Sequence, residues 1–223
     1  VTNNVVADDT TPPAVSGAQT LSSTKVQLSF DEALSAVNSP DTNAFTISGV
    51  ASSPTVTGTA IIGTNNQKIE LTLDSQVMPG DNDFTVDYAK TGTNDLQDSA
   101  GNKVVDFSQK VANNVEAITF HYAMPSWGTA DTVNLTYYKN GIEEASDGSM
   151  TKNGNWYEIT VPVEDATAST QFVIEFSDSG TKKYLNANDF TSNVTYTTST
   201  NNIWIDATTI SNWGSGDFSN NYY

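Results

Sequence analysis

Short stretches in which apolar and polar residues alternate run along most of the chain. The first clear one is KVQLSF, in which Val26, Leu28 and Phe30 share one face of an extended strand. We expect strands of this kind at Lys25–Phe30, Ala44–Ile47, Val56–Ile62, Lys68–Leu73 and Asp83–Tyr88. Pro, Gly, Asp and Asn cluster between these segments, which is typical of tight turns. About seven short strands at this spacing predict an antiparallel β-sandwich.

The alternation resumes after residue 116, and from there the chain is richer in aromatic residues. In AITFHYA, Phe120 and Tyr122 share one face of a strand, whereas His121 lies on the other. Further strands are expected at 133–138, Trp156–Val163, Gln171–Phe176, Val194–Thr197 and Ile203–Ile205. The chain is therefore predicted to be all-β, with two β-sandwich domains in tandem. We expect a linker at 1–13, one domain at 14–115, a second at 116–210 and a linker at 211–223.

The charge of the chain excludes several classes of partner. Its 223 residues include 26 acidic residues against 9 basic ones, and the formal net charge is −17. Phosphate backbones and anionic lipid surfaces are bound by clustered Lys and Arg, so neither a nucleic-acid partner nor membrane insertion is expected. The apolar stretches are also too short to span a bilayer. A charge of this size favours a monomer.

The lack of cysteine, together with frequent Asn, Thr, Ser, Asp and Gly, indicates where the protein works. Without cysteine there is neither a disulfide framework nor a thiolate metal site. This composition is typical of extracellular bacterial proteins that are attached to the cell surface or cell wall, and that is the localisation we predict.

No pattern of catalytic residues stands out in the sequence. A single His without Cys excludes most nucleophile–base triads, and none of GxSxG, HExxH, the P-loop or GxGxxG is present. Glycoside hydrolysis usually needs two carboxylates across a cleft. The acidic candidates are all explained by turns or by the solvent face of a strand: Glu143, Glu144, Glu158 and Glu175. The chain itself is therefore predicted not to be an enzyme.

Metal binding is limited to oxygen ligands. A zinc site would need several carboxylates beside the lone His. Calcium could be held by Asp95, Asp98 and Asn102, although a hairpin turn rich in Asp and Asn explains the same residues. No other cofactor is expected.

Segments of the first half resemble a known family. They are VQLSFDEAL at 26–34, PGDNDFTVDYAK from residue 79 onward and, most distinctively, DLQDSAGN at 95–102. In this order they resemble the bacterial Ig-like repeats of the SwmB type, over residues 9–114. The resemblance implies an Ig-like β-sandwich that acts as a spacer in large bacterial surface proteins.

The second half is rich in rings that suit sugar binding. All tryptophans lie in it, among Tyr, Asn, Thr and Asp residues: Trp127, Trp156, Trp204 and Trp213. A sugar ring presents an apolar C–H face and a polar rim, and Trp and Tyr offer an apolar plane with a polar tip. Sugars are neutral, so a strongly acidic protein loses no electrostatic energy by binding them. The same rings could instead pack in the core or cover the edges of a sandwich.

The order of elements in the second half resembles a family that uses this chemistry. The segments are ITFHYA (118–123), Trp127, VNLTYY (133–138), GSM (148–150) and NGNWYEITVPV (153–163). This order is similar to that of the starch-binding modules of carbohydrate-binding families 26 and 25, over residues 117–210. The resemblance implies a β-sandwich that binds starch or maltooligosaccharides, which are α-1,4-glucans.

The resemblance also implies the ligand-binding residues. Ala145-Ser146 stand where the family has a platform Trp, so the platform must be rebuilt here. One alignment places the second-strand contacts on Thr136 and Tyr138. Another places them on Asn134 and Thr136, and we prefer the first because it keeps an outward ring. Trp156 aligns with a tryptophan that we interpret as structural. The expected ligand-binding residues are His121, Trp127, Thr136, Tyr138, Tyr184 and Asn186.

These patterns together predict a non-catalytic function. We expect the chain to bind starch or maltooligosaccharides through an aromatic platform, as the targeting fragment of an extracellular amylase or of a starch-adhesion protein. The parent protein would then be a glycoside hydrolase such as an α-amylase. The alternatives are a structural or adhesin tandem of Ig-like domains that binds protein, and a module for another glycan.

Overall fold

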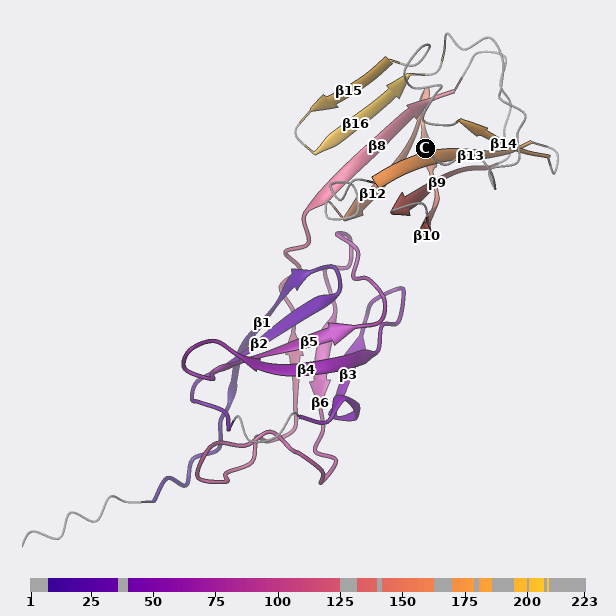
Figure 1. The fold of residues 1–223 in the computed structure, drawn as a ribbon. Coiled ribbons are helices and arrows are strands. Elements are labelled where there is room, and N and C mark those ends of the chain that lie inside the picture. The colour runs from indigo at the N-terminus through magenta and orange to yellow at the C-terminus, as the bar shows by residue number, and fades with distance from the viewer. Residues whose placement is uncertain are drawn as a thin grey trace, which may run out of the picture. The chain divides into compact units, whose positions relative to one another are not determined.

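The computed structural model describes most of the chain in separate ranges. These are 8–35, 40–124, 132–139, 142–162, 170–178, 181–185, 195–199, 201–206 and 208. For residues 136–139, 142–148, 170–178, 181–185 and 195–199 the structure describes the backbone and not the side chains. The chain divides into two compact units, Val1–Val115 and Glu116–Tyr223 (Figure 1). Among the described residues, no helix is long and apolar enough to cross a membrane.

The first unit consists of two β-sheets. One has the strand order β1-β2-β5-β4 and the other β3-β6-β7, and neighbouring strands are antiparallel. The strands are β1 (Val15–Ser22), β2 (Lys25–Phe30), β3 (Phe45–Ser48), β4 (Val56–Ile62), β5 (Lys68–Leu73), β6 (Thr85–Tyr88) and β7 (Phe107–Lys110). A short 3-10 turn, η1 (Thr42–Ala44), leads into β3.

Alternation along the strands builds the core of the first unit. The buried residues of β2 and β5 form one side of it: Val26, Leu28, Phe30, Ile69, Leu71 and Leu73. Phe84, Val86 and Tyr88 close it from the second sheet. The two sheets therefore enclose one apolar layer, as the sequence predicts. The bounds of β2, β4 and β5 are those that the alternation predicts.

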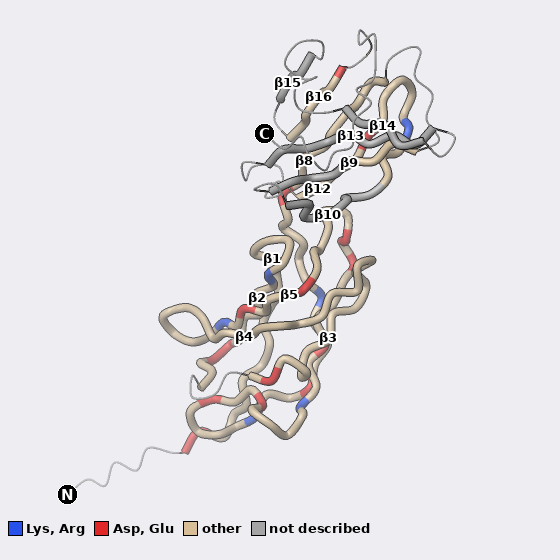
Figure 2. The backbone as a smooth tube through the Cα atoms, turned by 45° about the vertical axis from the view of Figure 1, so that its right-hand side comes forward, with Lys and Arg blue, Asp and Glu red and all other residues tan. Residues whose placement is uncertain are grey.

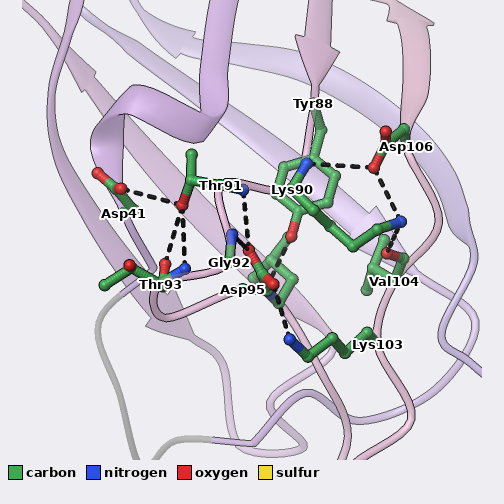
Figure 3. Close-up of polar contacts among 11 residues, drawn as sticks. Asp41, Tyr88, Lys90, Thr91, Gly92, Thr93, Asp95, Lys103, Val104 and Asp106 are labelled. Carbon is green, nitrogen blue, oxygen red and sulfur yellow. Dashed lines mark hydrogen bonds and ion pairs between the residues drawn. The ribbon is translucent and has the colours of Figure 1, made fainter.

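The long connection between β6 and β7 is held mainly by side-chain contacts (Figure 3). The Tyr88 hydroxyl accepts a hydrogen bond of 2.9 Å from the backbone N–H of Leu96. Asp95 accepts from the backbone N–H of Gly92 and from Nζ of Lys103 at 2.8 Å. The Lys103 contact lowers the pKa of Asp95, and burial raises the pKa of Tyr88 to about 12. These bonds hold in place a segment that lies between the regular strands β6 and β7.

The second unit also consists of two sheets. The five-stranded sheet has the order β11-β12-β8-β16-β15, and the four-stranded sheet has the order β10-β9-β13-β14. The strands are β8 (Ala117–Ala123), β9 (Thr132–Lys139), β10 (Ile142–Ser149), β11 (Thr151–Asn153), β12 (Trp156–Pro162), β13 (Thr170–Asp178), β14 (Thr181–Leu185), β15 (Thr195–Ser199) and β16 (Asn202–Asp206). β16 pairs with β8 in parallel, and the other described pairs are antiparallel.

The core of the second unit lies between these sheets. The five-stranded sheet contributes Phe120, Tyr122, Val161, Ile203 and Ile205, and β9 contributes Val133 and Leu135. Because Phe120 and Tyr122 face this layer, the residue between them, His121, lies on the outer face of the same sheet. The fold is therefore all-β with two sandwiches, which confirms the predicted fold class.

Candidate functional site

The outer face of the five-stranded sheet carries two tryptophans among polar residues. On β12, Ile159 packs against the core, so the neighbouring positions Trp156 and Glu158 alternate toward the outer face. On β16, Ile203 is buried and Trp204 lies outside the core. We call the following residues the outer-face cluster: His121, Asn153, Trp156, Glu158, Asn202 and Trp204.

The rings of the outer-face cluster pack against one another in two orientations. The His121 and Trp204 rings are stacked, with centroids 3.7 Å apart and an interplanar angle of 5°. These two residues stand directly opposite each other on the paired strands β8 and β16. Trp156 meets Trp204 at an angle of 86°, with centroids 4.9 Å apart. Both tryptophans are partly exposed, whereas only 8% of His121 is exposed.

Hydrogen bonds connect the polar members of the cluster. Nδ1 of His121 lies 2.9 Å from Oε1 of Glu158, and Nε2 lies 2.8 Å from Oδ1 of Asn202. Nδ2 of Asn153 donates to Oε2 of Glu158 at 2.9 Å. The bond from Asn153 and, next, the bond from His121 hold the pKa of Glu158 below its usual range. Glu158 is therefore ionised at neutral pH, with both oxygens engaged.

The outer-face cluster combines apolar rings with polar groups. Trp156 and Trp204 offer apolar surface, and Asn153 and Glu158 offer polar groups beside it. Hydrolysis by paired carboxylates needs two of them about 5–10 Å apart across a cleft. Glu158 is one carboxylate on this face, and Asp206 of β16 alternates with Trp204 toward the same face. The cluster can therefore recognise a ligand with an apolar face and a polar rim.

A second group of ligand-type side chains lies in the first unit, where acidic residues recur along the backbone (Figure 2). Carboxylate oxygens of Asp9, Glu32 and Asp98 all lie within 4.8 Å of one another. Burial and, next, the negative charge of Asp9 raise the pKa of Glu32. Acidic side chains often approach one another in this way without a cation, so the spacing alone does not identify a metal site.

The residues that the sequence suggests for calcium have partners within the protein. Asn102 donates its backbone N–H and its side-chain amide to Asp98, each at 2.8 Å. Asp95 instead pairs with Lys103. The three residues are thus divided between two separate sets of hydrogen bonds.

The sequence-predicted ligand-binding residues are divided between the two sheets of the second unit. His121 lies on β8 of the five-stranded sheet. Three others lie on β9 and β14 of the four-stranded sheet: Thr136, Tyr138 and Tyr184. Thr136, Tyr138 and Tyr184 pair with Val173, Gln171 and Glu175 of β13, in that order. These are every second residue of β13, so the three positions are equivalent in the alternation of the sheet. Trp127 and Asn186 lie outside the described residues.

Sequence reasoning did not single out the two tryptophans of the outer-face cluster. The family resemblance indicates a structural role for Trp156, although Trp156 alternates with the core-facing residues of β12. Trp204 alternates in the same way with Ile203 and Ile205. This alternation is a signal that could have placed both rings outside the core.

Part of the first unit matches a known family. Residues 8–93 match a family described as a putative flagellar system-associated repeat. This match covers less than half of the 223 residues. No curated protein matches the chain.

The chain is distantly similar to several solved structures. The N-terminal part of the bacterial S-layer protein SbsC is 11% identical with a TM-score of 0.40, over 79% of this chain and 44% of that chain. The pullulanase SAP of GBS, solved with maltotetraose, is 12% identical with a TM-score of 0.28, over 77% and 23%. Pullulanase from Bacillus acidopullulyticus is 11% identical with a TM-score of 0.27, over 77% and 34%. The chain thus spans less than half the length of each, and likenesses this distant do not indicate a function.

Proposed function

We propose that the second unit is a non-catalytic glycan-binding module whose ligand is starch or a maltooligosaccharide. The observation that carries the proposal is the pair Trp156 and Trp204, which meet at 86° on an outer sheet face beside Glu158. The order of sequence segments that resembles starch-binding modules supports the same ligand class. The first unit would act as an Ig-like spacer.

The shape of the ring pair favours a curved glycan. A cellulose-like chain is flat and suits aromatic rings that lie in one plane, whereas an α-1,4-glucan curves and presents its sugar faces at changing angles. Trp156 and Trp204 are nearly perpendicular, so they form a corner. One glucose unit can stack on an exposed ring surface while its hydroxyls reach the amide of Asn153 and the carboxylate of Glu158.

The charge of the cluster is compatible with a neutral ligand. Glu158 is ionised, and Oε1 of its carboxylate lies 2.9 Å from Nδ1 of His121. Lys152, on the neighbouring β11, lies 5.6 Å from the ring centroid of Tyr157 and not in the cluster. Among the described residues, a phosphate group would therefore meet a carboxylate without a lysine beside it, whereas a sugar would meet hydrogen-bonding groups.

The residues predicted from the family resemblance form a second proposed contact surface. Thr136, Tyr138 and Tyr184 share a register on the four-stranded sheet, and Trp127 and Asn186 belong to the same proposal. His121 belongs to the outer-face cluster instead, because both its ring nitrogens have partners there. The two surfaces can be separated by mutation.

The wider setting is part of the proposal. The match of residues 8–93 to a repeat family supports a role for the first unit as a repeated spacer. Together with the composition, this favours a monomeric segment of an extracellular protein on a bacterial surface. The parent protein is proposed to be an amylase-type glycoside hydrolase or a starch adhesin.

Native gel electrophoresis in polysaccharide-containing gels tests the ligand class. We expect the full chain to be retarded in amylopectin gels and to run freely in hydroxyethylcellulose and xylan gels. Equal mobility in all three gels would contradict glycan binding and favour a protein-binding tandem. Retardation in xylan gels alone would mean that the ligand is a glycan other than starch.

Three variants then locate the surface. Trp156→Ala should weaken retardation strongly, because a stacked ring contributes on the order of 1.5–3 kcal/mol, or about ten- to a hundredfold in Kd. Thr160→Ala is the matched control, since Thr160 is exposed on the same strand and contacts only Thr119 through its hydroxyl in the described structure. If Tyr138→Ala abolishes retardation while Trp156→Ala does not, binding occurs on the four-stranded sheet.

A further inference from the structure

His121 stands at the centre of the outer-face cluster but cannot itself offer a ring nitrogen to a ligand. It is the single histidine of the chain and is 8% exposed. Nδ1 contacts Glu158 and Nε2 contacts Asn202, at 2.9 and 2.8 Å. Its ring is covered on one side by Trp204. Any effect of His121 on binding must therefore act through these three neighbours.

The two hydrogen bonds of His121 both require a donor on the ring. A carboxylate oxygen such as Oε1 of Glu158 only accepts, and Oδ1 of Asn202 is also an acceptor. A neutral imidazole carries one N–H, whereas the imidazolium carries two. The imidazolium is therefore the form of His121 that can donate both hydrogen bonds at once.

The stacking contact with Trp204 favours the same charge state. A cation over the face of a tryptophan is attracted by the negative potential of the ring. The His121 and Trp204 rings are parallel within 5°, with centroids 3.7 Å apart. An imidazolium at this position would hold Trp204 by its face, and Glu158 and Asn202 by its edges.

The charged groups around His121 are acidic on the strands that flank it. Glu158 on β12 faces it directly. On β16, Asp206 is the other acidic residue, and its Oδ1 accepts from the backbone N–H and hydroxyl of Thr208. On β11 the contributing residue is Asn153, since Lys152 lies over Tyr157. The described neighbours therefore present no positive charge that opposes the imidazolium.

We propose that His121 is a positioning residue whose imidazolium form holds Glu158 and Trp204 in the arrangement that binds glycan, so that loss of its proton weakens binding. The glycan in this inference rests on the proposed function, whereas the effect of the His121 proton on Glu158 and Trp204 does not. When one proton leaves, a ring nitrogen lone pair faces an acceptor oxygen at less than 3 Å. Either the His121 ring or the Asn202 amide must then turn, and turning the ring moves the surface on which Trp204 stacks.

The pH range of the effect follows from the groups involved. Glu158 stays ionised from pH 5 upward because its hydrogen bonds hold its pKa below the usual range. Histidine is the side chain that ordinarily changes charge between about pH 5 and 8. The imidazole signals of the single histidine then show whether a change in this range comes from His121.

The first experiment needs no ligand and no variant. Because the chain has one histidine, its imidazole signals in a ¹H–¹³C NMR spectrum are identified without assignment. We expect those signals to shift and the nuclear Overhauser contacts between the imidazole and an indole ring to weaken, with one midpoint, as the pH of the full chain rises from 5 to 8.5. Imidazole titration with unchanged imidazole–indole contacts would overturn the positioning role, since it would mean that Asn202 turns and Trp204 stays in place.

The second experiment measures the Kd for maltoheptaose across the same pH range. The wild-type Kd should rise several-fold around the NMR midpoint, whereas His121→Gln, which keeps one donor but does not titrate, should bind weakly at every pH. A pH-dependent Kd that persists in His121→Gln would overturn the proposal. Thr160→Ala serves as the control and should keep the wild-type profile.

The two experiments separate the inference from the proposed function. If the imidazole signals and the imidazole–indole contacts change together but no glycan binds at any pH, the proposed function fails and the positioning role of His121 stands. If glycan binds with a Kd that is constant from pH 5 to 8.5, the proposed function stands and the inference fails.

Discussion

The two units place their aromatic rings differently. In the first unit the ring contacts lie in or against the core, and they join Phe30, Phe45, Tyr88 and Phe107. Among the described residues of the second unit, the closest ring contacts lie outside the core and join His121, Trp156 and Trp204. A ring in a core contributes to stability, whereas a partly exposed ring on a sheet face is available to a ligand. The difference supports a spacer role for one unit and a binding role for the other.

The two units also use charge differently. In the first unit, lysines pair with acids across strands, as in Lys25 with Glu70 at 2.6 Å and Lys110 with Asp83 at 2.6 Å. Lysine keeps its charge at all physiological pH values. In the outer-face cluster the partner of Glu158 is His121, a residue type that loses its charge near neutral pH. The first arrangement is constant, and the second can respond to conditions.

Tyr88→Ala tests the interior role of rings in the first unit and has the largest expected effect. Tyr88 is 2% exposed and contacts both Phe45 and Phe107. Removing its ring should lower the free energy of unfolding of the first unit by about 3–5 kcal/mol. Differential scanning calorimetry measures the loss. Tryptophan emission serves as an internal control, because all tryptophans lie after residue 116 and report the second unit.

Tyr88→Phe divides that effect into ring and hydroxyl. It keeps the ring but leaves the backbone N–H of Leu96 without its 2.9 Å partner. We expect a loss of about 1–3 kcal/mol, the penalty for an unsatisfied buried donor. A loss as large as that of Tyr88→Ala would mean that the hydroxyl, and not the packing of the ring, stabilises the 89–106 connection.

Trp204→Ala tests the exterior role of rings in the second unit. We expect glycan affinity to fall about ten- to a hundredfold, since one stacked ring is lost. Phe120→Ala, on the same sheet but fully buried, should instead lower the unfolding free energy of the second unit by about 3–5 kcal/mol. Isothermal titration calorimetry and thermal unfolding give the two readouts. Equal loss of stability in both variants would contradict the division between interior and exterior rings.

The sequence predicts the strands well where alternation is strict. Lys25–Phe30 and Lys68–Leu73 are strands with those bounds because every second residue is apolar. Val56–Ile62 also has its predicted bounds, although a bulge between Val56 and Gly58 interrupts its alternation. The sequence does not predict Ile142–Ser149 as a strand, since its apolar residues, Ile142 and Ala145, do not alternate with the polar ones. Pairing with β9 makes it a strand, and the pairing is a property of the fold and not of the segment.

The candidate site is less predictable for the same reason. Alternation places His121 on the outer face, but it does not reveal which residues flank it there. That depends on the order β12-β8-β16, and on the parallel pairing of β16 with β8, which brings Trp204 opposite His121. No local pattern encodes a contact between strands so far apart in the chain.

Acid should reduce the stability of the second unit through Glu158. Its folded-state pKa is lowered, mainly by the bond from Asn153 and then by that from His121. A carboxylate of this kind stabilises the fold above its unfolded-state pKa, and the contribution disappears as the pH falls through the folded-state value. Tryptophan-monitored unfolding between pH 3 and 7 should therefore show a steeper decline for wild type than for Glu158→Gln. Parallel curves would mean that the carboxylate makes no such contribution.

Lys103→Met is expected to have the smallest effect, and it tests whether the charge pairs of the first unit matter individually. Lys103 is half exposed, whereas the Asp95 side chain is 2% exposed. Asp95 keeps its bonds from the backbone N–H groups of Thr91 and Gly92 after the substitution, so the buried carboxylate is not left alone. We expect a loss of less than about 1 kcal/mol.

Salt distinguishes the charge of Lys103 from its packing. At about 1 M NaCl the screening length falls to roughly 3 Å, so the difference between wild type and Lys103→Met should shrink if it is electrostatic. Lys110→Met, in a pair whose members are both exposed, should cause no measurable change at either salt concentration. A loss for Lys103→Met that exceeds the loss for Tyr88→Phe would reverse the expected order of the two effects. It would make the lysine, and not the tyrosine hydroxyl, the main support of the connection between β6 and β7.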